Sequence, residues 1–449
     1  MNRRQFLRST LGCSAAGLAG SLDLFPLAAQ AQTAQDYKAL VCVFLFGGND
    51  GNNMVIPADS AGYAGYAAVR GTTSGINIAQ STLLQVQPRS IGTPFGLHPS
   101  LAAIHPLFAS GQLALLANVG PLTQPTTPSQ YAAGVHPESL YSHSDQQSEW
   151  QTSNASGASR TGWGGRIADA MGATNGGGFP VITSTAGVTL FVTGAVSSPL
   201  AIPPTGSFGL NGFTAGAASQ ARLAALNALL AIDRGNTFAA AASDITTQAV
   251  ALSGKVNPIL TGTTSTVAPL FDGQTTSIAA QFLAVAKMIE ARASLEARRQ
   301  VFFVSLGGFD THNNQLTTQA DLLGQLAPAM KSFHDATAQL GIADKVTTFT
   351  LSDFGRTFQP AAGGGTDHAW GNHHLIVGGA VRGGDFYGQF PTLALGGPSD
   401  AEKEGRWIPT TAIDQYGATL ATWFGVGATQ LPAVFPNLAS FPSANLGFV

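Results

Sequence analysis

Acidic and histidine side chains recur at short spacing in the C-terminal part of the chain. Asp310 and His312 stand two residues apart, and His368 directly follows Asp367. His374 opens an apolar run a few residues later. Carboxylate oxygens and imidazole nitrogens together are the ligands of zinc and other divalent transition metals. The set therefore predicts a divalent metal site, with zinc as the expected ion.

Two further acids and one further histidine widen this set. Asp50 and Asp353 each follow an apolar run, as Asp310 does, and His143 stands two residues before Asp145. Each of these residues also has a structural explanation, because an Asp or His after a strand can cap a helix or close a turn. Metal binding is the interpretation that accounts for all of them at once.

Ser142 and Arg356 are the candidates for the chemistry itself. Ser142 precedes a predicted helix over residues 143–152, whose free N–H groups and dipole favour an alkoxide and a bound phosphate or sulfate. A serine hydroxyl becomes a good nucleophile only when a metal or base lowers its pKa. Ser142 with Asp145 also resembles a helix cap. Arg356 has two interpretations as well: it could grip an anionic oxygen, or it could pair with Asp353.

Three apolar runs, each followed by turn residues and an acid, predict the strands that position these groups. They cover residues 40–46, 301–306 and 346–351. Helical patterns over 278–300 and 316–340 precede the second and third runs. This alternation predicts an α/β fold with a mainly parallel sheet and helices on both faces. Ligands bind beyond the carboxyl ends of such strands, so the acids should meet at one edge.

The rest of the chain predicts further strands and a loop-rich insertion. We expect one large domain over residues 32–449, with an insertion at about 176–275. Its first part, 176–216, is rich in Gly, Ser, Thr and Pro and predicts loops or short strands. Ala-rich helices near 220–233 and 278–298 should flank a second loop region. Further strands are predicted over residues 113–119, 180–183 and 374–381.

The N-terminus predicts export. Arg3 and Arg4 precede an apolar pair, a weakly apolar run extends to about Leu27, and Ala29 and Ala31 offer a cleavage site. This pattern is typical of a twin-arginine signal peptide over residues 1–31, with the twin-arginine translocase as a transient partner. The run is too interrupted by glycine and proline for a stable membrane span. We therefore expect a periplasmic or secreted protein.

Composition excludes some classes of function. Removal of residues 1–31 takes away three arginines and one aspartate, so the formal net charge moves from −3 to −5. Nucleic-acid binding would need a basic face, and none is expected. Only Cys42 remains after processing, so no intramolecular disulfide can form, and its apolar neighbours predict a buried thiol.

Five motifs in a fixed order carry a resemblance to a known family. They are the segments that contain Gly48-Asn49-Asp50-Gly51, Ser142-His143-Ser144-Asp145, Gly308-Phe309-Asp310-Thr311-His312, Ser352-Asp353-Phe354-Gly355-Arg356 and Gly365-Thr366-Asp367-His368. In these the chain resembles the twin-arginine-exported family called domain of unknown function 1501. That family in turn resembles a distant branch of the alkaline phosphatase and sulfatase superfamily. The resemblance implies an α/β core, two divalent metals and a nucleophile at a helix N-terminus.

The resemblance also implies roles for individual residues. Asp50 matches the first metal-binding acid of the superfamily. Asp310 and His312 match a later Asp and His pair, with one residue between them instead of three. Phe354 stands after Asp353 where the superfamily has a histidine, so one expected ligand is missing.

Two histidines are candidates for the end of the motif series. His368 matches the last metal-binding histidine or replaces the missing one, and His374 is a reserve candidate. The departure at Phe354 leaves one or two metal ions, or none, as the expected content.

Two functions compete on this basis. The first is an exported metal-dependent hydrolase of phosphate or sulfate esters, acting on an anionic small molecule or polymer. The second is a non-catalytic exported binding or assembly protein that keeps a degenerate hydrolase fold. The Asp and His set favours the first, and Phe354 favours the second.

Overall fold

The computed structural model describes residues 36–71, 75–176, 179–210, 216–232 and 235–449. The segment expected to be the twin-arginine signal, residues 1–31, lies outside the described residues. In the described part of the chain, none of the helices combines the length and apolar character needed to cross a membrane.

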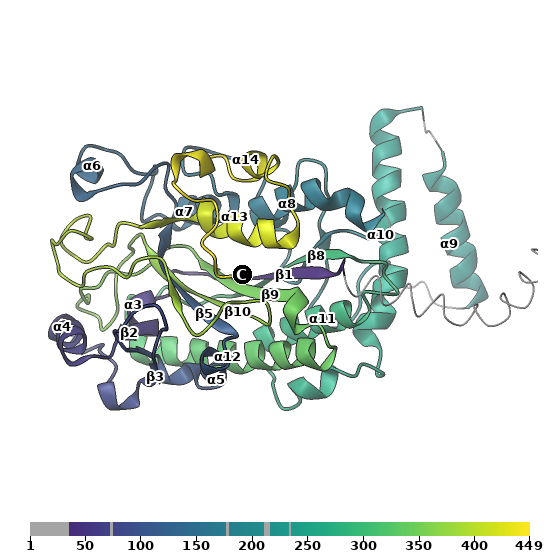
Figure 1. The fold of residues 1–449 in the computed structure, drawn as a ribbon. Coiled ribbons are helices and arrows are strands. Elements are labelled where there is room, and N and C mark those ends of the chain that lie inside the picture. The colour runs from purple at the N-terminus through teal and green to yellow at the C-terminus, as the bar shows by residue number, and fades with distance from the viewer. Residues whose placement is uncertain (1–35, 72–74, 177–178, 211–215, 233–234) are drawn as a thin grey trace, which may run out of the picture.

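A nine-stranded sheet forms the centre of the molecule (Figure 1). The long strand β1 (Lys38–Leu45) lies between β8 (Arg299–Leu306) and β9 (Val346–Ser352) and runs parallel to both. Strand β10 (Asn372–Gly378) is antiparallel to β9 and to β5 (Leu113–Gly120). The shorter strands pair in parallel at the two edges: β6 (Ile182–Ser184), β7 (Leu200–Ala201), β11 (Phe386–Tyr387) and β12 (Thr411–Ala412). The predicted mainly parallel sheet is confirmed.

The central strands are buried on both faces, which explains their continuous apolar sequence. Every residue of β1 except Lys38 is buried, including the thiol of Cys42. Alternate residues of β1 point into two separate hydrophobic clusters, with Val41 and Val43 on one side and Cys42 and Phe44 on the other. Each fully buried large apolar side chain contributes about 1.5–3 kcal/mol, so these clusters fix the sheet and the loops that leave it.

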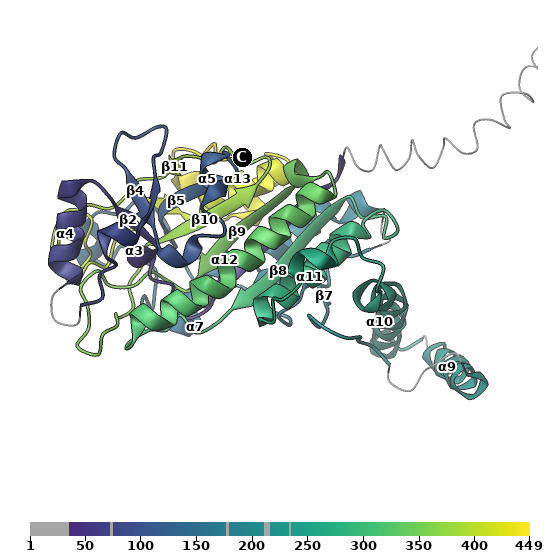
Figure 2. The ribbon, with the colours of Figure 1, turned by 90° about the horizontal axis from the view of Figure 1, so that it is seen from below.

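Helices cover both faces of the sheet, as Figures 1 and 2 show from two directions. One face carries α5 (Pro106–Ala109), α11 (Ser277–Glu290) and α12 (Gln315–Gln339). The other face carries α7 (His143–Thr152), α8 (Trp163–Met171), α13 (Ile413–Phe424) and α14 (Leu431–Val434). The predicted bounds of α7 are confirmed, and those of α12 are confirmed to within one residue at each end.

A small subsidiary sheet lies beside the end of the main sheet where β1 finishes. It consists of β2 (Val55–Pro57), β3 (Leu84–Val86) and β4 (Phe95–Leu97) in antiparallel pairs. Two helices adjoin it in the chain, α3 (Gly51–Met54) and α4 (Ser60–Arg70). Helix α4 ends with Arg70, whose buried side chain becomes important for the site.

Two expectations about helices need correction. The helix predicted over 278–300 ends at Glu290, because a turn with a left-handed Glu296 (φ 54°) follows and Arg299 already belongs to β8. The loop region predicted before it contains the 25-residue helix α10 (Thr237–Thr261). Pro258 is unfavourable in a helical pattern, but this proline lies near the C-terminal end of α10, where it disturbs few hydrogen bonds.

Helix α10 pairs with α9 (Ala217–Leu230), the Ala-rich helix expected near 220–233. The two project from the body beyond β8 and α11 (Figures 1 and 2). Most of their side chains are exposed. They lie far from the sheet edge that carries the acids.

Candidate metal centre

The site lies where three neighbouring strands end. Leu45 at the end of β1 is in register with Leu306 of β8 and with Ser352 of β9. The loops that follow therefore leave the sheet at one edge, and they carry Asp50, Asp310 and Asp353. This arrangement is the one that the repeated strand-then-acid pattern predicts.

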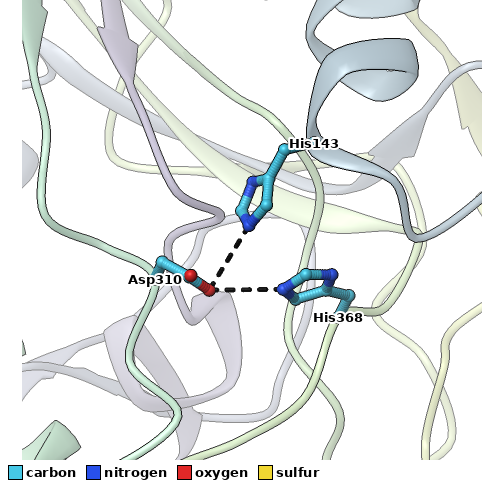
Figure 3. A group of neighbouring side chains, drawn as sticks. All are labelled: His143, Asp310 and His368. Carbon is cyan, nitrogen blue, oxygen red and sulfur yellow. Dashed lines mark hydrogen bonds and ion pairs between the residues drawn. The ribbon is translucent and has the colours of Figure 1, made fainter.

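One carboxylate oxygen of Asp310 is the common neighbour of three imidazoles. Its Oδ1 lies 3.0 Å from Nε2 of His312, 3.2 Å from Nε2 of His368 and 3.4 Å from Nε2 of His143. Figure 3 shows two of these rings pointing at Asp310, His143 from the start of α7 and His368 from a loop. The side chains are partly exposed, between 21% and 46%, so the group opens to solvent.

Each of the three imidazoles is held by its other nitrogen. Nδ1 of His143 lies 2.7 Å from Oδ2 of Asp353, and Nδ1 of His312 lies 3.1 Å from Oδ1 of Asp367. Nδ1 of His368 lies 2.7 Å from the carbonyl oxygen of Tyr141. Because these partners accept hydrogen bonds, the neutral rings carry their proton on Nδ1, and each Nε2 is left with a free lone pair. Metal-binding histidines are held in this way.

The converging lone pairs fit a divalent cation. Nε2 of His143 is buried and has no hydrogen-bond partner, and the Nε2 atoms of His312 and His368 face each other at 3.0 Å. Ligands at about 2.0–2.1 Å from a tetrahedral zinc ion are themselves about 3.3–3.4 Å apart, close to the separations around Asp310. The ligand atoms of His143, Asp310 and His368 all lie within 4.8 Å of one another.

The pKa values of Asp310 and His368 are shifted toward the forms that bind a cation. Partial burial tends to raise the pKa of Asp310, but the hydrogen bond and charge of Arg356, together with His312 and His143, outweigh it and lower that pKa. Burial lowers the pKa of His368, which favours its neutral form. A carboxylate and a neutral imidazole are the forms that bind metal ions.

Arg356 lies behind this group and is fully buried. Its Nε donates to the carbonyl of Gly48 at 2.9 Å, its Nη1 to Thr366 at 3.0 Å, and its Nη2 to Gly47 at 2.7 Å. Nη2 also pairs with Oδ1 of Asp310. Every nitrogen of the guanidinium is therefore bonded within the chain, and its acidic partner is Asp310.

Ser142 is the N-cap residue of α7, yet its side chain makes no capping hydrogen bond. Its Oγ lies 3.2 Å from Oγ of Ser144. The preceding residue, Tyr141, has a left-handed backbone (φ 73°), which is strained for an aromatic residue. In the chain, Ser142 lies between Tyr141, whose carbonyl binds His368, and His143. Its hydroxyl is not used for capping.

Asp50 follows β1 but turns away from the histidines. It caps α3 and accepts from the backbone N–H of Asn52 at 2.9 Å. Arg70 forms a buried ion pair with both of its oxygens, and Gln315 donates to Oδ2. The sheet edge brings Asp50 near the site, but its carboxylate faces a guanidinium.

His374 and Asp353 take different places from those of the three convergent histidines. His374 is buried in β10, packed against the rings of Trp150 at 4.9 Å and Tyr416 at 5.8 Å. Burial lowers its pKa to about 3. Asp353 has no exposed surface and contacts His143 and Gln147. Its carboxylate stands behind a histidine, where it orients the ring.

Phe354 fills the space beside the histidines. It is fully buried, and its ring lies 4.5 Å from that of His368 and 4.8 Å from that of His143. Gly48, with φ 82°, packs so closely that a Cβ there would strike the Phe354 ring. The residue that departs from the superfamily pattern thus supports two of the convergent imidazoles.

His143 belongs to the Asp and His set that the sequence predicts to bind a metal, but it is the one member of the observed group without a ligand role of its own in that prediction. It stands directly after Ser142, at the first position of the helix predicted over residues 143–152. The available signal was its place among several histidines near acids. The pairing of His143 with Asp353, 210 residues away in the chain, could not be seen from spacing.

The family model described as protein of unknown function (DUF1501) matches residues 37–400. The chain belongs to this family. The match covers all the motifs that carried the resemblance, including the DUF1501 segments that contain Asp310 and His368. No curated protein matches the chain.

Two solved structures are similar to this chain over most of its length. The crystal structure of Ps i-CgsB is 10% identical, with 89% of this DUF1501 chain and 77% of that chain covered and a TM-score of 0.35. The lipoteichoic acid synthase LtaP from Listeria monocytogenes is 9% identical, with 83% and 74% covered and a TM-score of 0.32.

Proposed function

We propose that this protein is a metal-dependent hydrolase of phosphate or sulfate esters. The observation that carries the proposal is the convergence of three imidazole Nε2 atoms on one oxygen of Asp310, with each Nδ1 held by an acceptor. His143, His312, His368 and Asp310 would hold the ion, and their donor set favours zinc. A bound cation would supply Lewis acidity toward an ester oxygen and lower the pKa of a nearby hydroxyl or water.

The chain's own residues would orient this chemistry. Asp353 fixes the ring of His143, Asp367 that of His312, and the Tyr141 carbonyl that of His368. The N-terminus of α7 offers unpaired N–H groups to an anionic ester. Ser142 at that terminus is the candidate nucleophile, since its hydroxyl does not serve as a cap.

Metal content and hydrolysis test this proposal together. Protein purified without chelator or metal-affinity resin should contain zinc by mass spectrometry and should cleave aryl phosphate or aryl sulfate esters. Asp310→Ala should lose both the ion and the activity. Ser142→Ala separates two routes: lost activity with the ion retained supports a serine nucleophile, and unchanged activity supports water. Protein that holds no ion and cleaves neither ester would contradict the proposal.

A second candidate is an exported binding protein without catalysis. It is favoured by Arg356, whose guanidinium is buried and bonded within the chain and so offers no free grip for an oxyanion. Under this alternative the protein would bind its ion and yet leave every ester intact. Single-turnover assays with metal-loaded protein distinguish the two.

We also propose that the protein works in the periplasm or outside the cell, after export by the twin-arginine translocase. The adjacent Arg3 and Arg4 support this proposal. Replacing both with Lys should leave a longer precursor in the cytoplasm. Normal export of that variant would exclude the twin-arginine route.

A further inference from the structure

Three acids follow three adjacent strands, but only two of them face the histidines. Asp310 follows β8 and Asp353 follows β9, the two neighbours of β1, and both contact His143. Asp50 follows the central strand β1. On position alone it should be the acid best placed to share a cation with its neighbours.

The carboxylate of Asp50 is saturated with hydrogen bonds. Its Oδ1 accepts from the N–H of Asn52 at 2.9 Å and from Nη2 of Arg70 at 3.1 Å. Its Oδ2 accepts from Nη1 of Arg70 and from Nε2 of Gln315. A carboxylate offers about four lone-pair directions, so these four donors leave none for a metal ion.

Arg70 is held in place as firmly as Asp50. Its side chain has no exposed surface, and it donates to the carbonyl of Thr357 at 2.9 Å and to Oδ1 of Asn53 at 3.1 Å. Its guanidinium also lies 5.4 Å from the ring centre of Phe358. Moving Arg70 away to admit a metal would leave a buried charge without its acidic partner, which is strongly destabilising.

A second guanidinium stands among the same acids. Arg356 binds Asp310 and the carbonyls of Gly47 and Gly48, in the loop that leads to Asp50. The charges of Asp310, Asp50 and Asp353 all act on it. A further divalent ion beside Asp50 would therefore meet two fixed positive charges.

We propose that the chain binds one divalent cation, at His143, Asp310, His312 and His368, and that Arg70 takes the place of a second cation at Asp50. This inference rests on the proposed function for the existence of the first ion. It assigns Asp50 and Arg70 a structural charge pair and leaves Asp310 as the acid that binds the metal.

Titration of the metal-free mature chain with Zn²⁺ tests this inference. Calorimetry and mass spectrometry should give one ion per chain. Asp50→Asn should also bind one ion, with Kd within about twofold of the wild type, whereas the matched change Asp310→Asn should raise Kd at least tenfold. If Asp50→Asn does not fold, the double variant D50N/R70M removes both charges and takes its place.

The outcomes separate this inference from the proposed function. Two ions in the wild type, or a tenfold weaker Kd in a folded Asp50 variant, would overturn the single-cation site while leaving metal-dependent hydrolysis intact. Absence of any bound ion would overturn both. One ion in the wild type and in the Asp50 variant, with loss in Asp310→Asn, supports the inference.

Discussion

Nδ1 of His143 lies 2.7 Å from Oδ2 of Asp353, a carboxylate with no exposed surface. Gln147, one turn further along α7, donates to the same oxygen at 2.8 Å. One oxygen at the end of β9 therefore fixes both the N-terminal turn of α7 and the direction of its first imidazole. The position of His143 depends on a residue that itself stays away from solvent.

Loss of the charge on Asp353 should weaken metal binding without removing a ligand. We expect Asp353→Asn to raise the Kd for Zn²⁺ by about 10–100-fold, because carboxylates behind ligating histidines have effects of this size. Competition with a chelator of known affinity measures the change. Asp145→Asn, an exposed acid on the same helix, is the control and should bind like the wild type. Equal affinity in both variants would show that Asp353 does not act through His143.

His374 and His312 should separate stability from metal binding. His374→Ala creates a cavity beneath Trp150 and should cost about 2–4 kcal/mol of stability while the protein still binds its ion. His312, with a 43% exposed side chain, should give the opposite result: an Ala variant of the metal-free protein melts near the wild type but loses affinity for Zn²⁺. Chemical denaturation and calorimetry measure the two effects. Lost ion binding in a folded His374→Ala protein would contradict this assignment.

Gly48 should tolerate no side chain. Ala at this position would need a left-handed backbone and would press on the ring of Phe354, which supports His368 and His143. We expect Gly48→Ala to lose about 2–5 kcal/mol of stability, from backbone strain and overpacking together. Gly65→Ala in α4, where a Cβ meets open space, is the matched control. It should be neutral or gain up to about 1 kcal/mol.

Glu149 should make stability fall in alkaline solution. Burial raises its pKa to about 8, against a hydrogen bond from Gln146 that lowers it. Because the folded-state pKa exceeds the unfolded one, this contribution is complete below about pH 4.5 and is lost as pH rises through about 8. Each such proton changes stability by about 1.4 kcal/mol per pH unit between the two pKa values.

The variant Glu149→Gln removes this proton and should flatten the dependence. Its melting temperature should resemble that of the wild type near pH 5 and exceed it at pH 9. Scanning calorimetry from pH 5 to pH 9 measures the difference, with the exposed Glu296→Gln as control. Parallel curves for wild type and Glu149→Gln would show that Glu149 is ionised in the folded protein throughout.

The sequence predicted the sheet well because its central strands are buried on both faces. The continuous apolar runs near Leu40, Val301 and Val346 correspond to β1, β8 and β9. Hydrophobic periodicity and composition do not reveal a helix whose side chains are mostly exposed. Helix α10, which also contains Pro258, was therefore not predicted. The helical pattern over 278–300 extends into the start of β8, because charged residues such as Arg298 and Arg299 also suit a helix C-terminus.

The site was predicted in part for a related reason. Asp310 and His312 directly follow β8, and His368 lies in the longer connection between β9 and β10, so the strand pattern could place them at one sheet edge. It could not reveal that Arg70 reaches Asp50, since that contact depends on how α4 lies against the subsidiary sheet. It also could not reveal which face of β10 carries His374. Long-range contacts of this kind are decided by packing rather than by local pattern.

The hydrogen bonds that fix His143 and His368 have a consequence for the order of folding and metal binding. His143 and its partner Asp353 are 210 residues apart, and His368 contacts the carbonyl of Tyr141 across 227 residues. The four candidate ligands are spread from His143 to His368, so no short peptide of this protein contains them all. An ion therefore cannot nucleate folding as it does in a zinc finger. The ion would then bind last, after the sheet has formed, and would stabilise a chain that is already folded. A chelator should then lower the melting temperature by the binding contribution alone and leave the architecture standing.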